Sequence, residues 1–148
     1  MKIAIAASAG GHLTEVLQVQ EAWKGKERFF VSDCRENAKA LARKEKVYFV
    51  SVPRRNPLRL LENIFQSFKI AYHEKPNMVI STGADVAVPF CLWAKLFGAK
   101  IVFIESLARI NEPSLSGKIL YPFADLFLVQ WKENLEFFPR AEFRGAVV

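Results

Sequence analysis

The motif SAGGH at residues 8–12 follows the apolar segment IAIAA and precedes a helical pattern. At the end of a parallel strand, such a turn lies where open α/β sheets bind their ligands. Gly10 and Gly11 allow a ligand to approach the backbone, and the start of a helix offers N–H groups and partial positive charge to an anion. We therefore predict that this turn, Ser8 included, binds a diphosphate. The alternative is a tight turn that needs glycine for steric reasons alone.

His12 stands at the first turn of the helix that follows, where the helix dipole favours a neutral imidazole. A neutral imidazole beside a phosphate site can act as a general base, so His12 is our first candidate for a catalytic residue. A structural histidine is the more common alternative. Asp33, at the end of the second predicted strand, is placed like the ribose-binding acid of a dinucleotide fold, but SAGGH lacks the third glycine of that motif.

A second turn of this kind occurs in STGADVAVP, residues 81–89. Thr82 and Gly83 follow the fourth predicted strand, and Asp85 is expected to cap the next helix. Strands one and four flank the usual switch point of such sheets, so the two turns are expected to be neighbours. Two adjacent anion-binding turns suit a diphosphate better than either turn alone.

Glu105 follows the fifth predicted strand, so its carboxylate is expected at the same sheet edge as His12. It is our second candidate for the base, although a surface carboxylate is the ordinary alternative. Arg109 is placed to pair with Glu105 or with phosphate. Ser116 and Gly117 open another helix, which is compatible with anion binding and equally with a plain helix cap.

Gln130 and Trp131 follow the sixth predicted strand. The amide of Gln130 could bind a sugar, and the indole of Trp131 could serve as a platform for the sugar ring. Simple packing of Trp131 is the alternative. Both residues complete the set expected at this edge of the sheet.

The segment NPLRLLENIFQSFKIAYHEK predicts a long amphipathic helix. One stripe is expected to pack in the core, namely Leu58, Leu61, Ile64, Phe65, Phe68 and Tyr72. Leu60 lies off this stripe, and Arg54, Arg55 and Arg59 cluster at the start of the segment. Basic residues beside exposed apolar ones can bind an anionic membrane surface, and a solvated helix end is the equal alternative.

The elements that must position these residues alternate between strand and helix. Strands are predicted at residues 2–7, 28–32, 47–52, 78–81, 100–104, 126–130 and 142–147, and helices at 12–23, 35–44, 57–74, 85–96, 116–123 and 132–138. Strands that are apolar on both faces and joined by helices indicate an α/β fold, a Rossmann-like parallel sheet with helices on both faces. With 148 residues, a single domain over residues 1–148 is expected.

Composition limits the possible functions. The chain is 51% hydrophobic, too much for a disordered chain, and its net charge of +6 favours an anionic partner such as phosphate, a membrane headgroup or nucleic acid. Cys34 and Cys91 show neither metal-ligand nor disulfide spacing, which indicates reduced thiols in a cytoplasmic compartment. The most apolar segment, residues 86–97, is shorter than the ~20 residues of a spanning helix, and no signal peptide is evident.

The segments SAGGHLTEVL, STGADVAVPF, IESLARINEPSLSGKILYPFADLFLVQW and FRGAVV, taken in order, resemble the Alg14-like family. Its members are subunits of the two-component N-acetylglucosaminyltransferase of dolichol-linked oligosaccharide synthesis, with bacterial and archaeal relatives in polysaccharide assembly. A more distant likeness is to the N-terminal half of the transferase that makes the bacterial cell-wall precursor lipid. The resemblance covers nearly the whole chain and implies the N-terminal-type domain of a GT-B glycosyltransferase.

The resemblance implies half of an inverting enzyme, inactive without its partner. This chain would bind a lipid-diphosphate-linked sugar acceptor and bring a separate Alg13-like subunit, which holds most of the UDP-N-acetylglucosamine or related UDP-sugar, to the membrane. It would be cytoplasmic and peripheral on the inner face of the membrane. Contact with the partner would involve the C-terminal tail, namely Arg144, Val147 and Val148.

The same resemblance implies no cofactor, no metal and no nucleic acid. His12 is then our choice for the catalytic base and Glu105 the second choice, and the partner chain could equally supply the base. Two other functions remain open. One is a non-catalytic scaffold for a glycosyltransferase, and the other is a stand-alone nucleotide-binding oxidoreductase of the Rossmann type.

Overall fold

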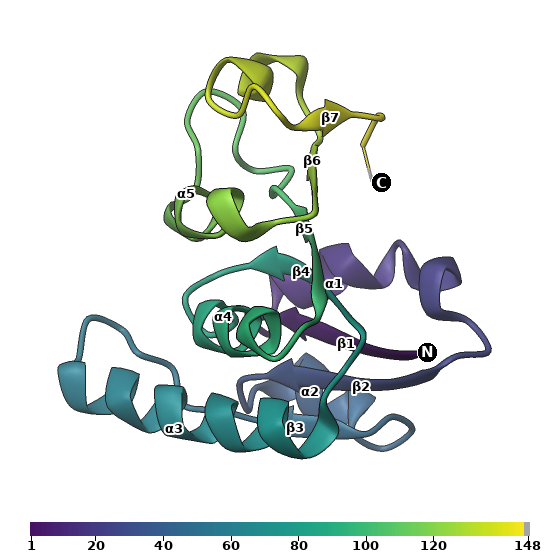
Figure 1. Cartoon of the computed structure of the whole chain (residues 1–148), viewed down its shortest axis with the longest axis vertical. Helices are drawn as coiled ribbons and strands as arrows, with labels where there is room; N and C mark the ends of the chain where they lie inside the picture. Colours follow the sequence, from purple (N-terminus) through teal and green to yellow (C-terminus); the bar gives the residue numbers. More distant parts are fainter. Residues whose placement is uncertain (147–148) are drawn as a thin grey trace.

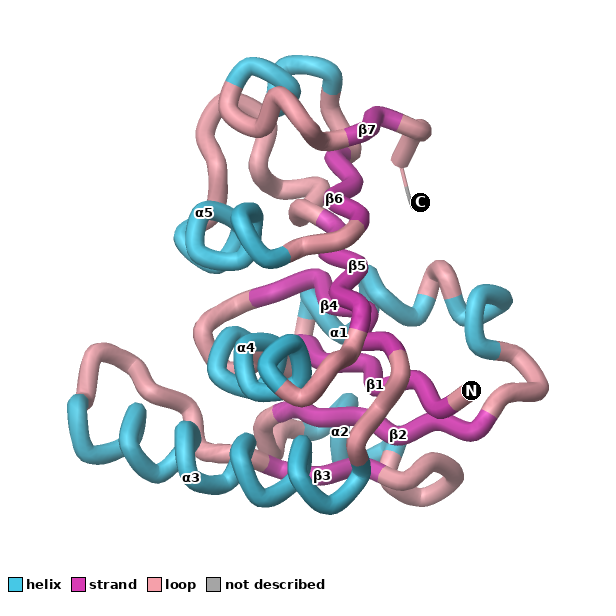
Figure 2. The backbone as a smooth tube through the Cα atoms, viewed as in Figure 1, coloured by secondary structure: helices cyan, strands magenta, loops and turns pink. Residues whose placement is uncertain are grey.

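The computed structural model describes residues 1–146, in which seven parallel strands form one sheet (Figures 1 and 2). The strands are β1 (Lys2–Ala7), β2 (Glu27–Ser32), β3 (Val47–Phe49), β4 (Met78–Gly83), β5 (Lys100–Ile104), β6 (Leu126–Val129) and β7 (Glu142–Phe143). Their order is β3-β2-β1-β4-β5-β6-β7, so β1 and β4 are neighbours at the switch point. The predicted parallel sheet and its switch point are confirmed. The last strand is shorter than predicted, because it ends at Phe143 and residues 144–146 are not strand; its predicted end, Val147, lies outside the described residues.

The helices occupy both faces of this sheet (Figure 1). They are α1 (Gly11–Leu17), α2 (Glu36–Leu41), α3 (Pro57–Glu74), α4 (Val88–Leu96) and α5 (Leu115–Leu120), with 3₁₀ turns η1 (Gln20–Trp23), η2 (Tyr121–Phe123) and η3 (Lys132–Glu136). The predicted helix at 12–23 is wrong in its second half. The N–H groups of Gln18 and Val19 bond three residues back, which tightens the end of α1 before η1 begins.

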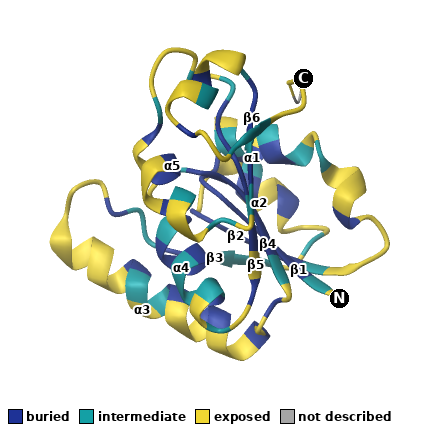
Figure 3. Ribbon diagram, turned by 45° about the horizontal axis from the view of Figure 1, so that its top comes forward, coloured by how far each residue is buried: buried dark blue, intermediate teal, exposed yellow. Residues whose placement is uncertain are grey.

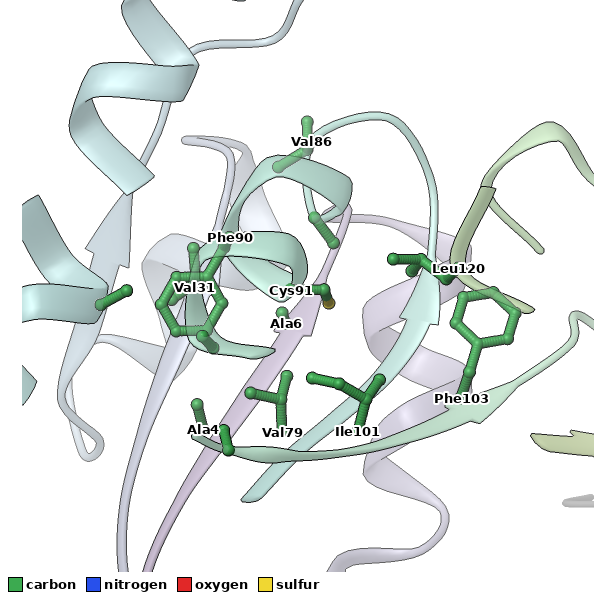
Figure 4. Packing of buried hydrophobic residues seen from close by; sticks show 14 of the residues in the cluster. Ala4, Ala6, Val31, Val79, Val86, Phe90, Cys91, Ile101, Phe103 and Leu120 are labelled. Atoms are coloured by element: carbon green, nitrogen blue, oxygen red, sulfur yellow. The ribbon is translucent and has the colours of Figure 1, made fainter. Parts of the chain in front are cut away.

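Two apolar clusters pack against the two faces of the sheet. Ile3 and Ile5 of β1 belong to the cluster under α1 and α2, and the alternate residues Ala4 and Ala6 belong to the cluster under α3 and α4. Figure 4 shows Ala6 beside Cys91 of α4, where only a small side chain leaves room for the helix. Burial raises the pKa of the Cys91 thiol to about 12, so this cysteine acts as a core residue.

Helix α3 contradicts the predicted core stripe. Leu58, Leu61, Phe65, Phe68 and Tyr72 are 76%, 50%, 64%, 36% and 58% exposed, and Ile64 is half-buried (Figure 3). The buried side of the helix instead carries Asn63, Ser67, Ile70, Ala71 and Glu74.

The reason is that the inner face of α3 meets polar groups. The amide of Asn63 donates to the carbonyl oxygens of Ser51 and Val86, at 2.7 and 3.1 Å, and the Ser67 hydroxyl donates to the Asn63 side chain at 2.9 Å. Buried polar side chains that are satisfied in this way can replace apolar packing. None of the helices among the described residues, α3 with its apolar stripe included, has the length and hydropathy to cross a bilayer.

Glu74, at the end of α3, is bound to residues at the amino-terminal ends of β1 and β3. Its carboxylate lies 3.0 Å from Lys2 Nζ and 2.5 Å from Lys46 Nζ, and it accepts a hydrogen bond from the Tyr48 hydroxyl. Burial alone would raise the pKa of this carboxyl, but the hydrogen bonds from Lys46, Tyr48 and Lys2 outweigh it and lower the pKa from 4.5 to about 2. The cluster therefore joins α3 to β1 and β3 through one charge.

Glu74→Gln is expected to destabilise the protein at neutral pH by about 1–3 kcal/mol. Because the pKa of Glu74 is lower in the folded chain than in the unfolded one, its contribution is complete above about pH 4.5 and is lost as the pH falls towards 2. Urea unfolding from pH 7 to pH 2.5 measures this. The control is Glu133→Gln, an exposed carboxylate in η3; equal pH dependence in the wild type and in Glu74→Gln would contradict the assignment.

Candidate functional site

A cleft of about 690 Å³ opens where the loops after β1, β3, β4 and β5 meet. Its walls include His12 after β1, Arg55 after β3, Asp85 after β4, and Arg109 after β5, together with Ser116 of α5. All four loops follow the carboxyl ends of parallel strands, which is the usual place for a ligand in an open α/β sheet. The sequence prediction of a site at this edge thus coincides with a real cleft.

His12 at the start of α1 and Thr82 near the end of β4 are joined by a reciprocal pair of hydrogen bonds. His12 Nδ1 lies 3.0 Å from the carbonyl oxygen of Thr82, and the Thr82 hydroxyl donates to the carbonyl oxygen of His12 at 2.7 Å. A carbonyl oxygen only accepts hydrogen bonds, so the proton must be on Nδ1, and Nε2 of the neutral ring is an acceptor. Thr82 is buried and His12 is half-buried. The imidazole is therefore fixed in one orientation and one tautomer.

The glycine turn after β1 is held by Asn37 of α2. The side-chain oxygen of Asn37 accepts from the N–H of Gly10 at 2.9 Å, and its NH₂ donates to the Gly10 carbonyl at 3.0 Å. Gly10 has φ +89°, ψ −134°, a conformation open to glycine almost alone. Because the Gly10 N–H is already bonded, this glycine serves the turn itself. The N–H groups of Gly11 and His12 make no hydrogen bond to any of residues 1–146.

Asp33 supports the same turn. Its carboxylate accepts from the N–H of Ala9 at 2.6 Å and from Arg35 Nε at 2.6 Å, and the Arg35 guanidinium also donates to the Ser8 hydroxyl and to the Ala9 carbonyl. Asp33 is only 2% exposed. Its oxygens are therefore engaged with the protein, which weakens the dinucleotide alternative that the sequence left open.

The turn after β4 has a different reason for its glycine. A Cβ on Gly83 would lie 2.7 Å from Ser116 Oγ and 3.1 Å from the ring of Phe103, and Gly83 has φ +98°. Gly83 is therefore required for the close approach of α5 to β4. The N–H of Gly83 donates to Ser81 Oγ, and that of Ala84 donates to Ser116 Oγ at 3.3 Å. Helix α4 begins at Val88 with Ala87 as its N-cap, so the predicted cap at Asp85 is wrong; Asp85 is exposed at the cleft.

Glu105 is fully buried and holds the start of α5. Its carboxylate accepts from the Ser114 N–H at 2.9 Å, from the Ser114 hydroxyl at 2.6 Å and from the Ser106 N–H at 3.2 Å. Ser114 is the N-cap of α5 and accepts from the Gly117 N–H. Glu105 thus closes both ends of the loop at residues 106–114, and its carboxylate lies behind Ser106 and Ser114, which line the cleft.

Glu15 holds the same loop from the α1 side. Its carboxylate accepts from the Leu107 N–H at 3.0 Å, from Gln130 Nε2 at 2.8 Å and from the Ser106 hydroxyl at 3.3 Å. Trp131 adds a hydrogen bond from its indole N–H to the Leu107 carbonyl. The sequence predicts sugar contacts for Gln130 and Trp131. In the structure they lie outside the cleft lining and hold the loop in which Arg109 lines the cleft.

The structure brings some predicted site residues together and places others around them. The cleft is lined by His12, Arg55, Leu60, Asp85, Arg109 and Ser116. The supporting residues outside its lining are Ser8, Gly10, Gly11, Thr82, Gly83, Glu105, Gly117, Gln130 and Trp131. Arg55 and its neighbour Arg54 have φ of +60° and +45°, a strained conformation for arginine that turns the loop before α3.

Sequence reasoning missed the anchors Glu15, Asn37 and Asn63. Glu15 was detectable, because it lies three residues after His12 on the same helix and hence on a neighbouring face. Asn37 and Asn63 gave no such signal. Each bonds to backbone that is distant in sequence, Asn37 to Gly10 and Asn63 to Ser51 and Val86.

A family model described as "Oligosaccharide biosynthesis protein Alg14 like" matches residues 3–147 of the chain. The UDP-N-acetylglucosamine transferase subunit ALG14 of Yarrowia lipolytica is 42% identical over 86 residues, which cover 54% of this chain and 40% of the yeast protein. The subunit of the same name from Homo sapiens is 28% identical over 181 aligned positions, which cover 100% of this chain and 83% of the human protein. The match to the Yarrowia protein thus spans less than half of that protein's length.

Two solved structures illustrate the fold. MurG of Acinetobacter baumannii matches 99% of this chain with a TM-score of 0.77 at 19% identity, over 46% of its own length. UDP-N-acetylglucosamine 2-epimerase of Rickettsia bellii matches 99% with a TM-score of 0.79 at 14% identity, over 45% of its length. These matches confirm the predicted fold class, a Rossmann-like sheet equivalent to one half of a GT-B protein.

Gly117→Ala is expected to destabilise the protein by about 1–3 kcal/mol, since the new methyl group would lie 2.8 Å from Glu105 Oε2 and from Ser114 Oγ. The control is Gly11→Ala, another helical glycine, whose Cβ meets nothing within 4 Å. Thermal unfolding of both variants measures the difference. Equal melting temperatures for the two would show that the carboxylate of Glu105 does not hold α5 tightly.

Proposed function

The chain belongs to the Alg14-like family of oligosaccharide biosynthesis proteins, and from this we propose that it is one subunit of a two-component inverting glycosyltransferase. The reaction transfers N-acetylglucosamine, or a related sugar, from a UDP-sugar to a lipid-diphosphate-linked acceptor. This chain binds the acceptor, and a separate Alg13-like subunit binds most of the UDP-sugar. The names of the relatives from Yarrowia and Homo sapiens, each a transferase subunit, support this proposal.

The observation that carries the catalytic part is the hydrogen bond between His12 Nδ1 and the Thr82 carbonyl. It leaves Nε2 as the basic nitrogen of a side chain that lines the cleft. As an acceptor hydroxyl attacks the anomeric carbon, its proton passes to Nε2, while the bond from that carbon to UDP breaks. Glu105 is fully buried and occupied by Ser106 and Ser114, so the geometry favours His12 as the base and Glu105 as a positioning residue.

The acceptor diphosphate is proposed to lie between the arginines of the cleft. Arg55 and Arg109 line the cavity from the loops after β3 and β5, and Arg109 Nη1 has a single ion pair among the described residues, with the exposed Glu112 at 3.3 Å. Guanidinium groups bind phosphate oxygens in a bidentate manner. The predicted contacts of phosphate with the Gly10, Gly11 and Gly83 turns stay predictions, and the bonded N–H groups of Gly10 and Gly83 reduce what those turns can offer.

Membrane recruitment is proposed to use α3. Its exposed stripe of Leu58, Leu61, Phe65, Phe68 and Tyr72 follows a spacing of three and four residues over the whole helix, and Arg54 and Arg59 are exposed at its start. A helix with an apolar face beside basic residues binds the interface of an anionic bilayer. The protein is then peripheral on the inner face of the membrane, as the resemblance implies.

Contact with the partner is proposed to use the C-terminal tail. Arg144 is exposed and pairs with Glu142 of β7 at 2.6 Å. Val147 and Val148 lie outside the described residues. β7 is the last strand of the sheet, so this tail leaves the fold beside the edge strand.

The experiment that tests the function is reconstitution of the chain with its nucleotide-sugar-binding subunit and a lipid-diphosphate acceptor. His12→Ala is expected to lower kcat by about 10²–10⁴-fold with little change in the KM of the acceptor, because a base acts on the transition state. The matched control is the second histidine, His73→Ala, exposed near the end of α3. Full activity of His12→Ala would contradict the role of His12 as the base; the chain would then be a non-catalytic scaffold, or the partner subunit would supply the base.

Membrane binding has its own test. The double variant Leu61→Asp and Phe65→Asp is expected to lower flotation with anionic vesicles about tenfold or more, and Arg54→Glu with Arg59→Glu to lower it in a salt-dependent manner. Phe137→Asp, at a residue that is 40% exposed in the segment after η3, serves as the control. Flotation that is unchanged in both double variants would rule out α3 as the membrane surface.

A further inference from the structure

An apolar groove of about 770 Å³ adjoins the cleft between α3, α4 and the α5–η2 segment. Leu60, Val88, Pro89 and Ile119 belong to the walls of both, so the groove begins where the cleft ends. In Figure 1, α4 lies between α3 and α5, in line with this placement. The volume falls within the ~300–1,000 Å³ of small-molecule sites.

The two hollows differ sharply in polarity. The cleft carries His12, the two arginines Arg55 and Arg109 and one carboxylate, Asp85, whereas Lys95 is the one charged side chain among the described residues that line the groove. Lys95 is paired with Asp125 at 2.8 Å. The combined site therefore has a cationic end and an apolar end, which is complementary to a ligand with an anionic head and a hydrocarbon tail.

Trp93 of α4 forms a wall of the groove and is held in place by contacts to α3 and α4. The Trp93 indole N–H donates to the Ile64 carbonyl at 3.1 Å, which ties α4 to α3, and the ring stacks on Phe97 at 6.2 Å and meets Phe68 edge-on at 4.9 Å. Ile64 and Trp93 are half-buried, in contrast to Leu61 and Phe65 on the outer stripe. Leu60 and Ile64 of α3 therefore face the groove and Leu61 and Phe65 face outwards, and the two surfaces adjoin at Phe68, which packs against Trp93.

We propose that this groove binds the first isoprene units of the acceptor lipid, with the diphosphate at the cleft end beside Arg55 and Arg109. The inference rests on the proposed function in one respect, that the acceptor is a lipid diphosphate. The groove holds the part of the chain next to the diphosphate, and the stripe on α3 holds the protein on the bilayer. Selection of the acceptor then depends on the lipid as well as on its sugar.

Binding of soluble prenyl diphosphates to the purified chain tests this without any transfer reaction. Dimethylallyl, geranyl and farnesyl diphosphate, with five, ten and fifteen carbons, are titrated by calorimetry beside inorganic pyrophosphate and farnesol. Each isoprene unit that enters the groove is expected to lower the Kd about tenfold. Farnesyl diphosphate should also change the fluorescence of Trp93, and Trp93→Phe should remove that signal.

Two matched variants separate the groove from the outer stripe. Ile64→Trp fills the groove and is expected to abolish the dependence on chain length, while Leu61→Trp, three residues earlier and 50% exposed, should retain it. Because Ile64→Trp could disturb folding, the Trp93 signal in the otherwise unaltered chain gives a second, independent reading.

Equal affinity for all three chain lengths, or equal behaviour of the two variants, would overturn the proposal. So would an Ile64→Trp variant that loses only vesicle binding, since the groove would then be part of the membrane surface. If binding depends on chain length but the reconstituted pair transfers no sugar, the proposed function is refuted and the proposed role of the groove is retained. If the pair transfers sugar but binding does not depend on chain length, the role of the groove is refuted and the proposed function is retained.

Discussion

The cleft depends on how the backbone beyond the carboxyl ends of the parallel strands is hydrogen-bonded. In the inner strands the N–H and C=O groups find partners in the ladder, but the loops that follow have none by default, and buried unpaired groups are costly. Here buried side chains supply the partners: Glu15 and Glu105 for the loop after β5, Asn37 for the glycine turn, and Asn63 for the loops after β3 and β4. The residues that line the cleft are held in place by this inner layer of acceptors and amides.

Helix α3 follows from the same constraint. Asn63 and Glu74 face inwards because the groups they meet are backbone carbonyls, lysines and a tyrosine hydroxyl, so the buried side of the helix is polar. The apolar residues are left on the outside, where no part of the described chain covers Leu58 or Phe65. A row of exposed apolar side chains is unfavourable in water unless a membrane or another molecule covers it. A bilayer is the covering that fits the basic start of the helix, and this is the physical basis of the membrane proposal.

The strands, their parallel arrangement and the edge of the sheet at which the cleft opens could be predicted from the sequence, because period, length and glycine turns are local signals. The ends of α1 and the orientation of α3 could not. An apolar stripe indicates that a helix has two faces but does not say which one meets the protein, so the sequence predicts core positions for Leu61 and Phe65 that the structure shows to be exposed. The sequence also places Glu105 and Gln130 correctly at this edge of the sheet, but it does not predict where their side chains point. That direction is decided by residues distant in sequence, Ser114 for Glu105 and Glu15 for Gln130.

Some N–H groups of the glycine turns are already bonded within the protein, and this limits how the charge of a bound ligand can be balanced. The Gly10 N–H is bonded to Asn37 and the Gly83 N–H to Ser81, so these two glycines contribute mainly shape. The N–H groups of Gly11 and His12 make no hydrogen bond to the described residues, and the charged donors at the cleft are Arg55 and Arg109. Two arginines complement one diphosphate. An inverting transfer from a UDP-sugar involves a second diphosphate, on the leaving group, whose developing charge must also be stabilised. Under the proposed two-component function, the donors for this second diphosphate are expected on the other subunit.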